Sequence, residues 1–263
     1  MTPLTFHIDR IAFAAPGLDD WDILSDALRH NHPWTDTQAW SPTPHCLSAR
    51  SARRVTPAIR LALTLAEKIG EALDENAGWV FASSVGEGET LHVILEALRT
   101  PEMLIQPLRF QNAVHNAPSG QWSIAAGITG PMTSLAAFDD TAGAGFLKSG
   151  LQVAREARPA GLVIYDVPLP APLDDKRPLG VQLAAGFALT VEPGPNTLAR
   201  VDMSLCQEIN TLPERIVSRS LSATGNPVAA VMPLLERLAE KKSGRVILGL
   251  HGGSSLCLDI SAP

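Results

Sequence analysis

An amphipathic segment followed by a short apolar run is the feature that most restricts the fold of this chain. Residues 56–75 read TPAIRLALTLAEKIGEALDE, with Thr56 and Pro57 in the cap and first-turn positions that favour a helix start. Apolar residues then recur at helical spacing, at Ile59, Leu63, Ala66, Ile69 and Leu73. The run that follows, GWVFASS, is short and apolar, which is typical of a buried strand. A helix beside a buried strand indicates the α/β class.

Further helical and strand patterns alternate along the chain. We expect helices within residues 19–28, 85–100, 146–158 and 226–242, and strands within residues 4–16, 133–137, 160–168, 186–193, 198–205 and 244–261. Asp19 or Asp20 is predicted to cap the first helix. The strands at 186–193 and 198–205 are predicted to pair with each other, and the last segment to form two strands bent at Gly252 and Gly253. Because no internal repeat or linker is evident, we expect a single domain over residues 1–263.

Composition excludes several classes of partner. The chain has 263 residues, 45% hydrophobic and 18% charged, with a net charge of −6 that argues against nucleic acid or an anionic membrane as the main partner. No apolar run reaches about 18 residues, so no transmembrane helix is expected. The N-terminus lacks the pattern of a signal peptide. Three cysteines, Cys46, Cys206 and Cys257, form no CxxC pair and are expected to be reduced thiols of a cytoplasmic protein.

Two motifs that resemble ligand sites are weak. The pair His30 and His32, with His45 and Cys46 downstream, lacks the four-ligand spacing of a zinc site, so surface histidines are expected. Glycines in GEGETLH and AGAGFLKS resemble phosphate-binding loops, but neither segment completes a known phosphate motif. Tight strand-to-helix turns explain these glycines more simply. We therefore expect no metal and no cofactor.

The segment GPMTSLAAFDDTAGAG, residues 130–145, has the pattern of a strand, a turn and a helix start. Such a turn commonly presents a nucleophile, but this one carries Phe138, Asp139 and Asp140. The two aspartates could act as paired carboxylates, one of which raises the pKa of the other. They could equally cap the helix and interact with its dipole. His251 lies in a glycine-rich bend, and its pattern fits either a general base or a plain polar residue.

Several of these segments together resemble the N-terminal half of β-ketoacyl-acyl-carrier-protein synthases. The matching stretches are VFASSVGEGE, FQNAVHNAPSGQWSIAAGITGPMTSL, AAGFALTVEPGPNTLARVDMSL and VILGLHGGSS. Asn116, Gly120 and the Gly130–Pro131 pair follow the family spacing without a gap. The resemblance implies half of a duplicated thiolase-like fold, an α/β structure with a mixed five-stranded sheet, flanking helices and a closing strand.

The chain departs from that family at its catalytic residues. The family nucleophile is a cysteine, and the corresponding position here is Asp139. A carboxylate that attacked an acyl thioester would form an anhydride, which would hydrolyse rather than pass the acyl chain on. The two histidine motifs downstream of the nucleophile are also missing. We therefore expect a catalytically incompetent subunit that resembles a chain length factor, of the half-size kind found in bacterial aryl polyene clusters.

The resemblance also implies a partner and an interface. The partner would be a full-length β-ketoacyl synthase in a heterodimer. The basic cluster Arg50–Arg54 would either contact an acidic acyl carrier protein or form a plain solvated surface. The residues placed at the interface or the partner's acyl pocket are Arg109, Phe110, Ala113, Asn116 and Met132. For Phe110, plain core packing is an equal alternative.

The rival function is that of a small enzyme. An acyl-thioester hydrolase or malonyl decarboxylase would use Asp139 with His115 or His251. A third possibility is a structural stabiliser without influence on chain length. The sequence alone leaves these alternatives open.

Overall fold

One mixed β-sheet runs through the chain and organises its helices. The structure is a computed structural model that describes residues 3–35, 40–102 and 104–262. Eight strands lie in the order β3-β2-β4-β5-β1-β6-β8-β7. They are β1 (Leu4–Ala14), β2 (Gly78–Ala82), β3 (Met132–Leu135), β4 (Ala160–Asp166), β5 (Leu183–Thr190), β6 (Ala199–Cys206), β7 (Gly244–Leu250) and β8 (Ser254–Ser261). The α/β class is confirmed, but the expected five strands are too few, because β6, β8 and β7 extend the sheet beyond β1.

The helices follow the sequence patterns closely. They are α1 (Trp21–His30), α2 (Ala49–Ala52), α3 (Pro57–Gly70), α4 (Gly88–Leu98), α5 (Pro107–Asn112), α6 (Ala117–Ala126), α7 (Thr141–Glu156), α8 (Ile216–Ser222) and α9 (Met232–Ala239), with short 3₁₀ turns η1 (Phe138–Asp140), η2 (Pro227–Val231) and η3 (His251–Gly253). Thr56 caps α3 through Ile59, and Asp20 caps α1 through Asp22, as predicted. None of the helices in the described residues is long and apolar enough to span a bilayer.

The predicted pairing of residues 186–193 with 198–205 is wrong. Strand β1 lies between β5 and β6 and pairs antiparallel with both. The reason is visible in β1 itself, where apolar side chains such as Phe6 and Phe13 are completely buried. A strand that is buried over most of its length belongs in the middle of a sheet, with a partner on each side.

The three strands nearest the β1–β6 contact on each side are arranged alike. On one side lie β1, β5 and β4, and on the other lie β6, β8 and β7, with antiparallel pairing throughout both groups. Each group ends in the unit helix, strand, strand: α7-β4-β5 in the first and α9-β7-β8 in the second. The two groups thus share a strand arrangement, although no repeat is evident in the sequence.

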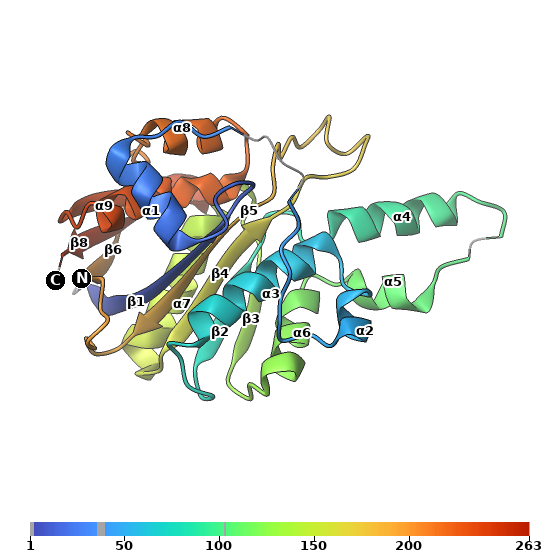
Figure 1. Cartoon of the computed structure of the whole chain (residues 1–263), viewed down its shortest axis with the longest axis horizontal. Helices are drawn as coiled ribbons and strands as arrows, with labels where there is room; N and C mark the ends of the chain where they lie inside the picture. Colours follow the sequence, from blue (N-terminus) through green and yellow to red (C-terminus); the bar gives the residue numbers. More distant parts are fainter. Residues whose placement is uncertain (1–2, 36–39, 103, 263) are drawn as a thin grey trace.

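Helices cover both faces of the sheet and form two apolar layers. Helices α3 and α6 lie on one face, and α7 lies on the other with α1, α9 and η2 beyond it (Figure 1). The layer under α3 includes Trp79, Phe81 and Tyr165. The layer around α7 includes Phe6, Phe146 and other residues from both halves of the sheet. Because α7 contacts β1, β2, β4 and β7, the core depends on the close approach of this helix.

Small residues allow α7 to approach its neighbours. A Cβ atom on Gly143 would overlap the carbonyl oxygen of Gly249 in β7, and one on Gly150 would crowd Met203 and Phe6. A side chain at these positions would force the helix away from the strands. The glycines that resembled a phosphate-binding loop therefore serve packing, at least in the case of Gly143.

Two of the three cysteines are joined, contrary to the expectation of reduced thiols. Cys206 in β6 and Cys257 in β8 form a disulfide with their Cα atoms 6.1 Å apart, while Cys46 is free. These cysteines are 51 residues apart in the sequence, and only the pairing of β6 with β8 brings them together.

The close contact of α7 with β7 generates a stability prediction. We expect Gly143→Ala to lower the free energy of unfolding by at least about 2 kcal/mol, because the added methyl group meets backbone that cannot move cheaply. Gly120→Ala is the matched control, since Gly120 lies in α6 with open space around it. That control should gain about 0.5–1 kcal/mol from helix propensity. Equal melting temperatures of the two variants would contradict the packing described here.

Candidate functional site

The turn between β3 and α7 holds the position at which the sequence analysis placed a lost nucleophile. Phe138 has a φ of 54°, an uncommon conformation for a non-glycine residue. Thr141 stabilises the turn: its hydroxyl donates to the carbonyl of Phe138 at 2.7 Å and accepts from the amide of Ala137 at 3.0 Å. Asp140 occupies the N-cap position of α7, but its side chain makes no capping hydrogen bond. The expected side-chain cap is therefore absent at Asp140, and the Thr141 hydroxyl holds the turn that precedes the helix.

An ion pair occupies the predicted nucleophile position. Nη1 of Arg177 donates to Oδ1 of Asp139 at 2.6 Å, and the guanidinium carbon lies 3.6 Å from the centre of the Phe138 ring. The Asp139 side chain is 67% exposed, whereas that of Arg177 is 15% exposed. A partly desolvated guanidinium stacked on a ring is held more firmly than one in water.

A cleft of about 290 Å³ lies beside Asp139. Its walls come from the loop after β6, the α8–η2 turn and β7, and they are mostly apolar: Leu212, Pro213, Pro227, Ala229, Ile247 and Leu248. The turn at the start of α7 thus faces a small, largely apolar space. This cleft contains neither of the two histidines that the enzyme alternative invoked.

The structure does not bring those histidines to Asp139. Nε2 of His115 lies 3.1 Å from the carbonyl oxygen of Ser83, and the ring packs on Gly86. His251 is exposed in the turn between β7 and β8. Among the described residues, neither histidine makes a hydrogen bond or ion pair with Asp139. The described residues thus do not pair Asp139 with either histidine that the enzyme alternative names.

A buried acidic cluster lies at the ends of β2 and β4. Asp166 accepts hydrogen bonds from the Ser83 hydroxyl at 2.8 Å and from the Ser84 amide at 2.9 Å. Burial raises the pKa of the Asp166 carboxyl to about 6, although these hydrogen bonds act in the opposite direction. Burial also raises the pKa of the Tyr165 phenol well above its usual value. The sequence analysis missed this cluster, and the only available signal was a carboxylate that directly follows an apolar strand.

Glu87, at the start of α4, is the second buried carboxyl. It accepts from the Thr56 hydroxyl at 2.9 Å and from the Thr90 hydroxyl at 3.4 Å. Burial raises the pKa of Glu87 to about 7, again against the effect of its hydrogen bonds. The group ties the start of α3 to the start of α4, and at neutral pH it carries only part of its negative charge.

The predicted interface residues lie on α5, on the turn into α6 and on the edge strand β3. Arg109 and Phe110 are exposed on α5, and Ala113 and Asn116 follow on the turn into α6. Met132 lies on β3 and packs partly against the core. The hydroxyls of Ser119 in α6 and Ser134 in β3 are 2.9 Å apart, so the two segments are neighbours. Phe110 is 67% exposed, which rules out core packing for this side chain.

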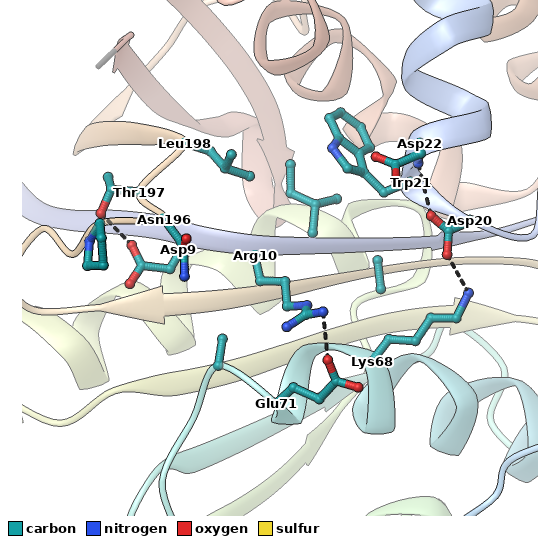
Figure 2. Close-up of a pocket in the computed structure, with 14 residues that line it drawn as sticks. Asp9, Arg10, Asp20, Trp21, Asp22, Lys68, Glu71, Asn196, Thr197 and Leu198 are labelled. Atoms are coloured by element: carbon teal, nitrogen blue, oxygen red, sulfur yellow. Dashed lines mark hydrogen bonds and ion pairs between the residues drawn. The ribbon is translucent and has the colours of Figure 1, made fainter.

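A cleft of about 750 Å³ lies elsewhere, between β1, the start of α1 and the end of α3. Its charged side chains are largely paired with one another. Arg10 contacts Glu71 at 2.6 Å, and Lys68 contacts Asp20 at 3.1 Å (Figure 2). Thr197 donates to Asp9 at 2.7 Å. The charged groups of this cleft are thus paired with one another, and the sequence analysis predicted none of its lining residues to belong to a functional site.

The buried Glu87 carboxyl generates a pH prediction. Its pKa is about 7 in the folded chain and 4.5 in a model peptide, so the native state keeps the proton longer than the unfolded state. The free energy of unfolding should therefore fall as the pH rises from about 4.5 to 7. We expect Glu87→Gln to remove up to about 3 kcal/mol of this loss. The free energy of unfolding of the variant should therefore exceed that of the parent at pH 8 but not at pH 4.5.

The measurement is chemical denaturation of parent and variant at both pH values. Glu89→Gln is the control, because Glu89 is an exposed residue of the same first turn. It should change stability by less than about 1 kcal/mol at either pH. A parallel pH dependence of parent and Glu87→Gln would show that Glu87 is not the titrating group.

Comparisons with known proteins place this geometry in a family. The family model described as "Beta-ketoacyl synthase, N-terminal domain" matches residues 27–243. No curated protein matches the chain.

Solved structures show the same fold. A ketosynthase in complex with its chain length factor from Xenorhabdus doucetiae matches with a TM-score of 0.68 and 18% identity, over 97% of this chain and 99% of that chain. The ishigamide ketosynthase/chain length factor matches with a TM-score of 0.73 and 12% identity, over 98% of this chain and 99% of the other.

A longer ketosynthase also matches in part. The ketosynthase from module 1 of the bacillaene synthase of Bacillus amyloliquefaciens FZB42 has a TM-score of 0.56 and 13% identity, over 81% of this chain and 47% of that chain. The fold of the present chain thus corresponds to whole chains of similar length and to about half of a longer one. With its thiolase-like sheet and the family match over most of its residues, the chain belongs to the family of the β-ketoacyl synthase N-terminal domain.

Proposed function

We propose that the chain is a non-catalytic, chain-length-factor-like subunit that pairs with an active β-ketoacyl synthase in fatty acid or polyketide-type chain elongation. Two structures that match it over nearly their full length contain a ketosynthase together with a chain length factor. Aryl polyene synthesis is the form of this chemistry that we favour. In this role the chain stabilises the synthase and shapes the pocket that holds the growing acyl chain.

The observation that carries the proposal is an arm with exposed apolar side chains. Helices α4 and α5 project from the body of the molecule, well away from the centre of the sheet (Figure 1). The large exposed apolar side chains of the arm and its continuation are Leu91, Leu95, Leu98, Leu104, Phe110 and Val114. Between the helices lies a largely apolar groove of about 220 Å³. An apolar surface of this kind in a soluble protein typically marks a protein interface.

The neighbouring edge of the sheet supports the same conclusion. Strand β3 is the last strand on this side, so the outer edge of its backbone has no strand partner among the described residues. The opposite edge, at β7, is protected, because Thr211 exchanges two hydrogen bonds with Ile247. Open strand edges invite pairing with another chain, and proteins usually cover those they do not use. A partner at the β3 edge would also meet the α5–α6 segment.

The chemistry at Asp139 favours a subunit without condensing activity. The carboxylate is engaged with Arg177, and thioester attack by a carboxylate would lead to an anhydride rather than a transferable acyl group. The hydrolase and decarboxylase alternatives need Asp139 together with His115 or His251. His115 instead lies against Ser83, and His251 is exposed in its own turn. No contact of the described residues favours these alternatives.

The predicted pocket residues then receive specific roles. Arg109, Phe110 and Ala113 would lie near the floor of the partner's acyl pocket, with Asn116 and Met132 at the interface beside them. Bulk at this floor would limit how far the acyl chain extends. The basic cluster Arg50–Arg54 would remain available to an acidic carrier protein.

We expect Ala113→Trp to shorten the products of the co-expressed pair, because an indole at the pocket floor would occupy space for several methylene groups. Ala113 closes the short helix α5 and is partly exposed, so the larger side chain should be tolerated by the fold. Product length is measured by mass spectrometry of the released chains.

Ala223→Trp is the matched control, since Ala223 is an exposed alanine that closes the short helix α8 in a similar backbone conformation. The control should leave product length unchanged. Unchanged products with Ala113→Trp, in a complex that still forms, would reduce the role of the chain to stabilisation alone.

A further inference from the structure

Three arginines line a small pocket, and the proposed function assigns no ligand to this pocket. The pocket has a volume of about 270 Å³ and lies between the starts of α3 and α4 and the side of α5. Its basic side chains are Arg53, Arg54 and Arg109, and its only acidic side chain is Glu89. The lining therefore carries an excess of two positive charges, in a chain whose net charge is −6.

None of these arginines has a carboxylate partner in the described part of the chain. Other arginines on the surface are paired, for example Arg10 with Glu71, Arg99 with Glu96 and Arg245 with Asp259. In the cleft between β1, α1 and α3, the cationic side chains are likewise paired with carboxylates, as Figure 2 shows for Arg10 and Lys68. Unpaired guanidinium groups on three separate positions of one concave surface attract an anion from solution.

The pocket is built by contacts that hold its walls together. The side-chain amide of Asn112 donates to the carbonyl of Arg54 at 2.9 Å, which ties α5 to the segment before α3. Arg109 lies three residues before Asn112 and therefore on the same face of α5. Val55, between Arg54 and the α3 cap, is buried in the core and anchors this segment.

Two helix starts add to the positive potential. The pocket wall includes the start of the 14-residue helix α3, at Val55, Thr56 and Pro57. It also includes the start of the 11-residue helix α4, at Glu89 and Thr90. Both helix dipoles present their positive ends at this pocket. Behind the wall, Thr56 and Thr90 hold the Glu87 carboxyl, whose pKa is raised by burial to about 7. This carboxyl therefore opposes a bound anion only in part at neutral pH.

We propose that the pocket lined by Arg53, Arg54 and Arg109 binds the phosphoryl group of a small phosphate ester. Guanidinium groups pair with phosphate oxygens in a bidentate manner, and a dianion matches the excess charge of the lining. A concave site formed from three separate segments fits a compact anion better than the flat surface of an acidic protein. The inference does not depend on the proposed pairing with a ketosynthase.

The test is calorimetric titration of the full chain, without any partner, at constant ionic strength because salt screens such contacts. The probes are pyrophosphate and glycerol 3-phosphate, with acetate and a hexaglutamate peptide as the competing anions. We expect the two phosphates to bind one site. The double variant Arg53→Gln/Arg54→Gln and the single variant Arg109→Gln should each weaken binding by about tenfold or more.

Arg50→Gln is the matched control, because Arg50 is an exposed arginine of the same segment that does not line the pocket. It should change affinity by less than about twofold, as expected for a charge outside the contact set. Circular dichroism checks that each variant retains its fold. The absence of phosphate binding, an equal loss in Arg50→Gln, or tighter binding of hexaglutamate than of the phosphates would each overturn the proposal. Because the partner is absent, these outcomes leave the test of pairing unaffected.

Discussion

The close packing of α7 against β7 is the contact on which the rest of the structure depends. Gly143 lies so near the carbonyl of Gly249 that no side chain fits between them. This contact joins the two groups of strands, because α7 belongs to the first and β7 to the second. It also fixes the turn at Phe138 and Asp139 beside the cleft formed by the second group. The position of this turn is therefore fixed by packing, whatever chemistry the turn carries.

Local signals made part of this fold predictable. The cap at Thr56, the glycine bend at Gly252 and the apolar run before Ser83 are encoded by adjacent residues, and each was placed correctly. The central position of β1 and the disulfide of Cys206 with Cys257 depend on pairing between distant segments. Such pairing leaves little trace in a single sequence, because side-chain alternation determines which face is buried but not which strand lies alongside.

The candidate site was predictable to a similar degree. The spacing from the Gly130–Pro131 pair located the turn and Asp139, but the partner of Asp139 lies 38 residues away in a proline-rich loop. The acidic cluster around Asp166 and Glu87 was missed for the same reason. Its members come from segments that are ordinary in isolation, and only the meeting of β2, β4 and α4 makes their burial and raised pKa values apparent.

The apolar arm and the open β3 edge together constitute the main evidence for a partner. The most direct measurement is the mass of the species purified after co-expression with a ketosynthase that retains its cysteine. The account predicts a stable 1:1 complex in which the partner covers the apolar side chains of the arm. It predicts that this complex is lost in the double variant Leu95→Glu/Phe110→Glu. Leu212→Glu is the control, because Leu212 is another exposed leucine and follows Thr211 beside the opposite edge strand, β7. A chain that remains monomeric beside the synthase, or an arm variant that binds as well as the parent, would contradict the account.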